Sequence, residues 1–185
     1  LIRRGFKIYP AFWCMLMMTI FVAALRFEQI FSRWLLGEIL FLQNYLGGLW
    51  NHTWSLAVEE HFYIGLSILF LLLVKVAGKN PFRFIPSIAI LLVCICLGLR
   101  ILNMHTYEMY THENFLYGTH IRMDSLFFGV LISYYWHFKS LQSRLEFIPS
   151  VIFIVLGLLL LAPAFIFTLE DHKWISVYGF ILFYL

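Results

Sequence analysis

The sequence has few charged residues, which make up 12% of its 185 residues. A soluble domain is about a quarter charged and about half apolar, whereas 62% of this chain is hydrophobic. The shortage of charge therefore argues against a soluble globular domain. The net charge of +3 is also too small to indicate nucleic acid as a partner.

Cysteine is scarce as well, and no metal-ligand pattern is present. Cys14, Cys94 and Cys96 lie inside apolar runs, where we expect them to pack as small apolar side chains. The histidines and glutamates of residues 103–119 have no compact ligand spacing, so we expect no metal site. No internal repeat, low-complexity tract or linker divides the chain.

What the sequence does contain is a series of apolar runs, several of them about 20 residues long, the length that a helix needs to cross a bilayer. They predict an all-α, polytopic transmembrane helical bundle with about six membrane segments. We expect one membrane-embedded domain over residues 1–185 and no separate soluble domain. The chain begins at Leu1 beside basic residues and ends at Leu185 inside an apolar run. We therefore expect a fragment that lacks the first and last membrane helices of a longer protein.

The distribution of basic residues predicts which side each loop faces. Residues 34–50 are either a short span or an interfacial or re-entrant segment. If they do not cross, eight of the 13 basic residues gather on the side of Arg3, which the positive-inside rule makes cytoplasmic. Cysteines placed at Lys79 and Glu113 should then label from opposite faces, with Lys79 cytoplasmic.

The most informative stretch is Trp54–Tyr63, which reads WSLAVEEHFY and leads into an apolar run. If it is helical, Ser55, Glu59 and Tyr63 share one face, and His52 lies about one turn earlier. Ionisable groups at a membrane edge usually face a protein interior or a wet cavity. This polar stripe is therefore a candidate for binding a substrate or handling a proton.

Helix geometry turns the adjacent Glu60 about 100° away from that stripe. A purely interfacial role for the whole stretch is the alternative. In that interpretation Trp54 and the tyrosines lie at the lipid headgroups and the carboxylates lie in water.

Two further segments combine charge with an apolar run. In the first, Arg4 and Lys7 precede Tyr9 and Pro10, and the proline suits the first turn of a helix. In the second, Arg122 and Asp124 open the apolar run that follows Thr119. A buried arginine and aspartate should be paired or should line a cavity.

Helical spacing would place His120 and Asp124 on one face of that second segment. A structural ion pair between two helices and a substrate-lining role both remain open for Arg122 and Asp124.

Three segments, RGFKIYP from Arg4, WSLAVEEHFY from Trp54 and RMDSLFFG from Arg122, occur in this order. In sequence and order they resemble motifs of the acyltransferase-3 family of integral-membrane O-acyltransferases. The resemblance implies transfer of an acyl group, often acetyl, from a cytoplasmic acyl-CoA-type donor to a hydroxyl acceptor, frequently an envelope carbohydrate. It implies the donor as a co-substrate, no bound cofactor, and a multi-pass protein of the bacterial cytoplasmic membrane.

The resemblance also implies roles for individual residues. Arg4 and Lys7 would hold the donor, although lysine stands where the family has a second arginine and lacks its bidentate fork. Glu59 could accept hydrogen bonds from an acceptor sugar, orient a histidine or pair with Arg122, and we favour orientation or pairing over a role as general base. The family's catalytic histidine lies on an earlier helix that this chain lacks, so we expect the chain alone to be inactive. A secondary transporter and a noncatalytic membrane scaffold are the competing hypotheses.

Overall fold

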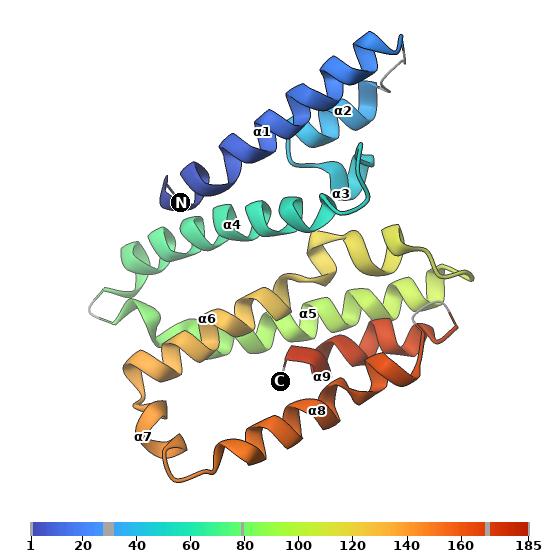
Figure 1. Cartoon of the computed structure of the whole chain (residues 1–185). Helices are drawn as coiled ribbons and strands as arrows, with labels where there is room; N and C mark the ends of the chain where they lie inside the picture. Colours follow the sequence, from blue (N-terminus) through green and yellow to red (C-terminus); the bar gives the residue numbers. More distant parts are fainter. Residues whose placement is uncertain (1, 28–31, 79, 169–170, 185) are drawn as a thin grey trace. The chain divides into compact units, whose positions relative to one another are not determined.

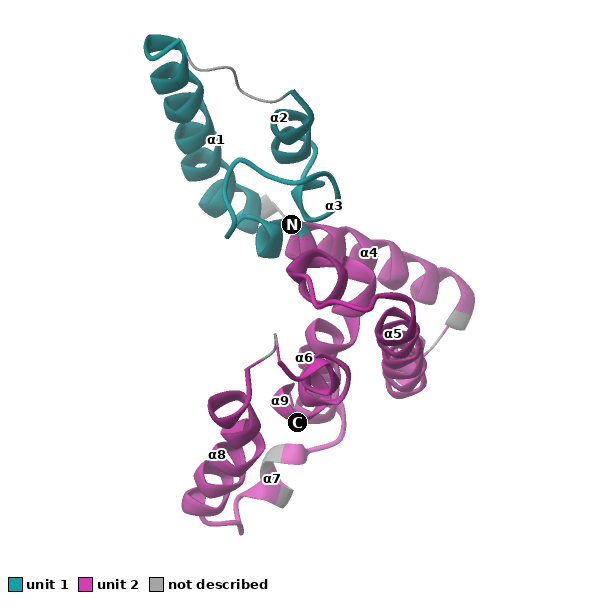
Figure 2. Ribbon diagram, turned by 90° about the vertical axis from the view of Figure 1, so that its right-hand side faces the viewer, with its two compact units in different colours: residues 1–57 teal, residues 58–185 magenta. Residues whose placement is uncertain are grey.

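The computed structural model describes residues 2–27, 32–78, 80–168 and 171–184. Two compact units divide the chain, residues 1–57 and residues 58–185 (Figure 2). Every regular element among the described residues is helical (Figure 1), which confirms the all-α prediction. Lys79, chosen above as a labelling position, lies outside the described residues.

The first unit contains three helices and the first turn of a fourth: α1 (Ile2–Leu25), α2 (Ser32–Ile39), α3 (Gln43–Leu46) and the start of α4 (Trp54–Ala77). Phe41, between α2 and α3, stacks on Phe12 of α1, with ring centroids 5.1 Å apart. Its ring also lies 5.6 Å from that of Tyr9. This aromatic contact joins the loop after α2 to α1.

The structure corrects the expected start of the first helix. We predicted that Pro10 would occupy the first turn, but α1 begins at Ile2 and Pro10 lies inside it. A proline removes one backbone hydrogen bond to the residue four positions earlier. The apolar helix continues on both sides of that single loss.

Residues 34–50 do not form one continuous helix. Helix α2 has 8 residues and α3 has 4, so they extend about 12 Å and about 6 Å at the usual helical rise. A bilayer core is about 30 Å thick. The lengths therefore favour the interfacial or re-entrant interpretation over a short span.

The second unit contains most of α4 and all later elements. These are η1 (Pro81–Phe84), α5 (Ile85–Thr106), η2 (Glu113–Tyr117), η3 (Thr119–Ile121), α6 (Met123–Phe138), α7 (Leu141–Leu145), α8 (Ser150–Ile166), η4 (Ile175–Gly179) and α9 (Phe180–Tyr184). Its core is built by Phe62 of α4, Ile85 and Ala89 of α5, and Phe127 and Tyr134 of α6. Helices α5 and α6 run side by side (Figure 1).

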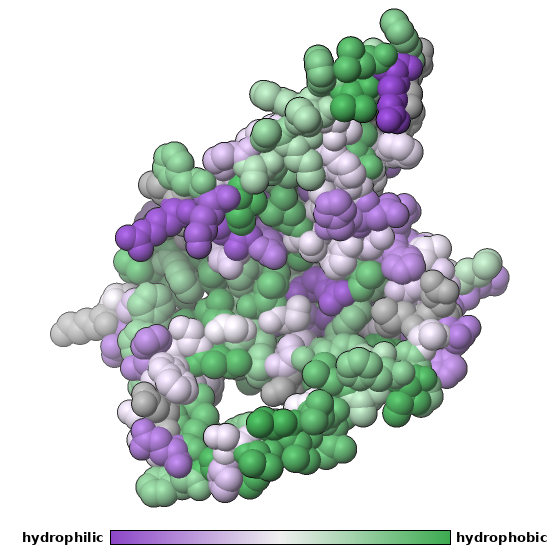
Figure 3. Space-filling view, in the orientation of Figure 1, coloured by the Kyte–Doolittle hydropathy of each residue, from purple (hydrophilic) through white to green (hydrophobic). Residues whose placement is uncertain are grey.

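Three helical stretches among the described residues are long and apolar enough to cross a membrane: Arg3–Leu25, Trp54–Val76 and Pro81–Thr106. The predicted total of about six membrane segments is not confirmed, because α6 has 16 residues and α8 has 17. Helix α8 buries none of its residues within the described chain. Hydrophobic side chains cover its visible surface in Figure 3, as expected where lipid or another protein covers a helix.

Candidate functional site

Four polar side chains are buried together in the first unit. Glu38 of α2 has no exposed surface, and Gln43, Asn44 and Thr53 are each at most 4% exposed. We call these four residues the Glu38 cluster. Acidic residues are almost never fully buried unless they are paired, so this group is the most unusual feature of the first unit.

Hydrogen bonds satisfy only one of the two carboxylate oxygens of Glu38. Its Oε1 accepts from the Leu49 amide at 2.9 Å and from the Thr53 hydroxyl at 2.8 Å. Its Oε2 has no hydrogen-bond partner among the described residues. The amide of Gln43 donates to the Thr53 carbonyl at 2.9 Å, while its own buried Oε1 has no partner in the described part of the chain.

Thr53 is the residue that joins this cluster to α4. It occupies the position before the first helical residue, Trp54, where a hydroxyl often accepts a bond from the helix. Here the hydroxyl instead lies within reach of two acceptors, Glu38 Oε1 and the Trp50 carbonyl at 3.0 Å. The start of α4 is therefore fixed to a buried carboxylate.

A glycine allows the backbone to approach Glu38 this closely. A Cβ added at Gly48 would lie 2.6 Å from Glu38 Oε1 and 3.0 Å from Gln43 Cβ. Any larger residue at Gly48 must displace the carboxylate or the backbone.

Burial raises the pKa of Glu38, because desolvation penalises the charged form. Hydrogen bonds from Thr53 and Leu49 oppose this effect, and so does nearby His52. A buried carboxyl group with one unpartnered oxygen is suited to hold a proton or to accept a hydrogen bond from an incoming hydroxyl or imidazole. Both are steps of proton-transfer chemistry.

The predicted stripe of α4 is less buried than the Glu38 cluster. Helix α4 runs without interruption from Trp54, so Ser55, Glu59 and Tyr63 keep their expected spacing. Ser55 is exposed and donates to the carbonyl of His52, which is also exposed, at 3.2 Å. Glu59 and Tyr63 are half-buried. The roles predicted for them stay predictions.

Of the neighbouring residues of the same motif, Glu60 is more enclosed than the stripe. Glu60 is only 4% exposed, and Trp54 is half-buried. The Nδ1 of His61 lies 2.8 Å from the Thr119 hydroxyl of η3. This hydrogen bond ties α4 to the segment that precedes α6.

In the second unit the principal buried polar group is an ion pair between α5 and α6. Arg100 Nη2 lies 2.6 Å from Asp124 Oδ1, and both side chains are at most 1% exposed. Arg100 also donates through Nε and Nη2 to the Ile121 carbonyl at 2.9 and 2.7 Å. Tyr184 of α9 donates to the other Asp124 oxygen at 3.2 Å. We call Arg100, Asp124 and Tyr184 the Arg100 cluster.

Asp124 forms its ion pair with Arg100 of α5. Arg122 Nε donates to the Leu116 carbonyl at 3.2 Å, and its guanidinium lies 3.9 Å from the centre of the Phe180 ring. Burial lowers the pKa of Arg122 to about 10, so its charge persists at neutral pH. The structure thus favours a structural ion pair between helices, with Arg100 as the cation.

The prediction that His120 and Asp124 share one helix face is wrong. His120 belongs to η3, whereas α6 begins at Met123, and Arg122 between them has φ −127° and ψ −9°. The physical reason lies in the Ile121 carbonyl, which accepts two bonds from Arg100 rather than an intrahelical amide. Burial lowers the pKa of His120, which favours a neutral imidazole.

Arg4 and Lys7 lie three residues apart on α1, which places them on neighbouring positions of one helix face. Arg4 is half-buried and Lys7 is exposed. Among the described residues, no group of three histidine, cysteine, aspartate or glutamate side chains is placed to hold a metal ion.

The sequence patterns above do not select Glu38 or Arg100 as candidate site residues. The available signal was a single charge inside or at the end of an apolar segment, which usually faces a partner or a cavity.

Comparison with known proteins gives distant similarities. No family model and no solved structure matches the chain. A protein of Haemophilus influenzae, itself described as uncharacterized, is 26% identical over 182 residues, covering 89% of this chain and 74% of that protein. A Staphylococcus aureus (strain COL) protein named "Putative O-acetyltransferase" is 32% identical over 144 residues, and its counterpart from strain N315 is equally similar.

The match to each of these Staphylococcus aureus proteins covers 71% of this chain but 22% of the relative. The chain therefore aligns with about a fifth of those proteins. The similarity supports an acetyltransferase-like relationship.

Proposed function

We propose that this chain is part of a membrane-bound O-acyltransferase of the acyltransferase-3 type. The observation that carries the proposal is the 32% identity over 144 residues to proteins named as O-acetyltransferases. The three ordered segments that resemble the family, and three helices able to cross a membrane, support it independently. The acyl group is acetyl in the simplest case, and the acceptor is a hydroxyl of an envelope carbohydrate.

The reaction transfers the acyl carbon from sulfur to oxygen. The acceptor hydroxyl oxygen attacks the thioester carbonyl, the carbon–sulfur bond breaks, and the thiol leaves with a proton. A base must take the hydroxyl proton as the new carbon–oxygen bond forms. The family resemblance assigns that base to a histidine on another helix, and it assigns Arg4 and Lys7 to the phosphates of the donor.

We add Glu38 to this scheme as a positioning residue. Its Oε1 is fixed by Thr53 and Leu49, while its Oε2 is buried without a partner among the described residues. A carboxylate oxygen without a partner can still accept hydrogen bonds. In the proposed reaction it accepts a hydrogen bond from the base or from the acceptor hydroxyl and so fixes its orientation.

The test uses membrane vesicles that contain the protein to which this chain belongs. Labelled acetyl-CoA is supplied, and label on carbohydrate is measured. Arg4→Ala should raise the KM for acetyl-CoA about tenfold, because one charge-assisted phosphate contact is lost, and should leave the KM for the acceptor nearly unchanged. Lys75→Ala, a change at an exposed cation on α4, is the matched control.

Two results would reject the proposal. One is the absence of label on any hydroxyl acceptor in vesicles that hold correctly inserted protein. The other is solute uptake that depends on this protein without any transfer of the acetyl group, which would favour a secondary transporter instead.

A further inference from the structure

A pocket separate from both buried clusters opens where α5 begins and α6 ends. It has a volume of about 490 Å³ and is lined by Asn80, Pro81, Phe82, Arg83, Tyr134, Phe138 and Lys139. All seven residues belong to the second unit. We call it the Arg83 pocket. Its volume is within the range of about 300–1,000 Å³ that is usual for small-molecule sites.

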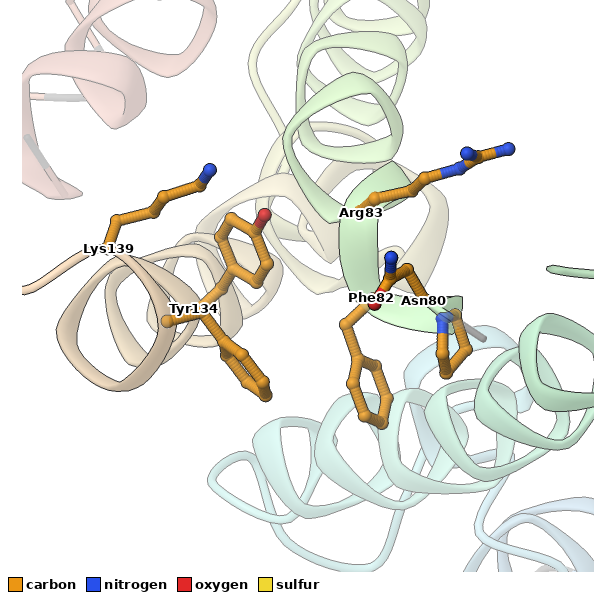
Figure 4. A pocket seen from close by; sticks show the side chains of 7 residues that line it. Asn80, Phe82, Arg83, Tyr134 and Lys139 are labelled. Carbon is orange, nitrogen blue, oxygen red and sulfur yellow. The ribbon is translucent and has the colours of Figure 1, made fainter. Parts of the chain in front are cut away.

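The charged groups that line this pocket, Arg83 and Lys139, are both cations, and the other polar groups, Asn80 and Tyr134, are neutral. Figure 4 shows Lys139 and Tyr134 on the α6 side, and Asn80, Phe82 and Arg83 on the side of η1. No carboxylate is among the lining residues. In Figure 4 the Arg83 guanidinium points away from Tyr134 and Lys139, so the two cations line opposite sides of the hollow. Without an acidic residue among the lining residues, they still give a positive potential that attracts an anion.

The hydrogen-bond donors Tyr134 and Arg83 are also available to a ligand in the pocket. The Tyr134 hydroxyl makes no hydrogen bond to another described residue, although its ring is held by stacking on Phe138, with centroids 5.5 Å apart. Arg83 is exposed, and its guanidinium lies 4.6 Å from the centre of its neighbour's ring, that of Phe84. An exposed cation–π contact is weak, so Arg83 can turn toward an anion.

Aromatic rings form the remaining wall. Phe82 packs against Phe138, with ring centroids 5.8 Å apart, and also against Phe70 of α4 at 5.6 Å. These rings connect the pocket to the core and hold its shape independently of the two cations. A ligand that carries an apolar or aromatic part beside its anionic group would contact both kinds of wall.

We propose that the Arg83 pocket binds a phosphate group attached to an apolar or aromatic body. A phosphate presents several acceptor oxygens, enough for Arg83, Lys139 and the Tyr134 hydroxyl to donate to it together. Two sources carry this chemistry: a soluble nucleotide such as coenzyme A, and the headgroup of an anionic phospholipid. The site does not rest on the acyl-transfer proposal, because its evidence lies in the pocket alone.

The experiment measures binding and needs no catalytic activity. The purified chain in detergent micelles is titrated separately with coenzyme A and with dioctanoyl phosphatidylglycerol, and binding is followed by native mass spectrometry. The double variant Arg83→Gln/Lys139→Gln should weaken binding of at least one probe by tenfold to about a hundredfold, as expected for lost charge-assisted bonds.

Two further variants separate the pocket from general surface charge. Lys75→Gln removes an exposed cation of α4 that does not line the pocket, and it should leave the affinity within about twofold. Tyr134→Phe keeps the ring in the core and removes only the hydroxyl, so it should weaken binding by about five- to tenfold. Far-ultraviolet circular dichroism checks that each variant keeps its helix content.

If the double variant selectively weakens the binding of coenzyme A, the proposal is supported and the phosphate that binds in the pocket belongs to a nucleotide. Selective weakening of phosphatidylglycerol binding would support it with a lipid headgroup as the source. The proposal is overturned if neither probe binds the unaltered chain, or if the double variant leaves the affinity for both probes unchanged, as expected if coenzyme A is held by Arg4 and Lys7 alone. It is also overturned if Lys75→Gln weakens binding as much as the double variant, which would mean that the basic residues act only as diffuse surface charge.

Discussion

Each of the two units buries a carboxylate, but the two carboxylates differ in how many of their oxygens have a hydrogen-bond or ion-pair partner. Asp124 lies against the guanidinium of Arg100 and also accepts a hydrogen bond from Tyr184, so both of its oxygens are engaged. Among the described residues, the hydrogen bonds to Glu38 come from neutral donors, and its Oε2 has no hydrogen-bond partner. The first arrangement links α5, α6 and α9 through one carboxylate, and we call it the clamp. The second leaves an acceptor open, as expected of a group that meets a substrate or a base.

The largest expected effect is the loss of the clamp. Asp124→Asn leaves Arg100 buried beside a neutral amide, which should destabilise the fold by about 3–5 kcal/mol. Replacement of both partners, Arg100→Met with Asp124→Leu, should cost much less, because no buried charge remains. Denaturation of the purified chain in micelles measures both values. A loss below about 1 kcal/mol for Asp124→Asn would mean that water already screens this pair.

The second effect concerns the glycine beside Glu38. Gly48→Ala introduces a Cβ at 2.6 Å from Glu38 Oε1, and such overpacking should cost about 1–3 kcal/mol. Gly98→Ala, at a helical position of α5 where an added Cβ meets no atom within 4 Å, is the control and should be neutral or slightly stabilising. Equal stability of both variants would show that the Glu38 cluster is loosely packed.

A third comparison concerns the two adjacent carboxylates of α4. Glu59 shares the predicted stripe, whereas Glu60 is nearly buried. Glu59→Gln should lower acetyl transfer about tenfold or more, because the group that it positions is left misaligned. Glu60→Gln should lower it less at matched membrane levels. Vesicle transfer rates normalised to inserted protein provide the measurement. Equal rates would leave the stripe with only an interfacial role.

The smallest effect is the pH dependence of stability from Glu38. Its pKa is raised in the folded protein from an ordinary value of 4.5, so the folded state holds the proton more tightly than the unfolded state. Stability from this group is therefore complete below pH 4.5 and is lost as pH rises through the folded pKa. Denaturation of the chain in micelles at a series of pH values measures this slope, which for one titrating group is at most about 1.4 kcal/mol per pH unit. Glu38→Gln should remove it, and a slope that is unchanged in the variant would assign it to another group.

The sequence predicted well the elements that local composition determines. Helices α4 and α5 lie where their apolar runs are, because the length and hydrophobicity of a run decide whether a membrane-type helix forms. The start of α1 was missed because Pro10 was treated as a boundary, although a helix tolerates the loss of one hydrogen bond inside an apolar segment.

The candidate site was less accessible to sequence reasoning. Arg100 and Asp124 are 24 positions apart, and nothing local distinguishes Arg100 from Arg122 as the partner. The packing of α5 against α6 determines which arginine pairs with Asp124. Glu38 was visible as a charge in an apolar run, but its burial depends on a hydrogen bond to Thr53, 15 positions later. Tertiary hydrogen bonds of this kind leave no periodic pattern in a sequence.

The most direct test compares the two carboxylates in one assay. Acetyl transfer to carbohydrate is measured in vesicles for Glu38→Gln and for the paired Arg100→Met/Asp124→Leu variant, each normalised to folded protein, across a range of pH. We predict that Glu38→Gln folds and inserts but loses about a hundredfold in rate, with an altered pH profile. The paired variant should keep its rate per folded molecule within about threefold. A Glu38→Gln variant with full activity, or a paired variant that folds and is inactive, would contradict the division between a functional carboxylate and a structural one.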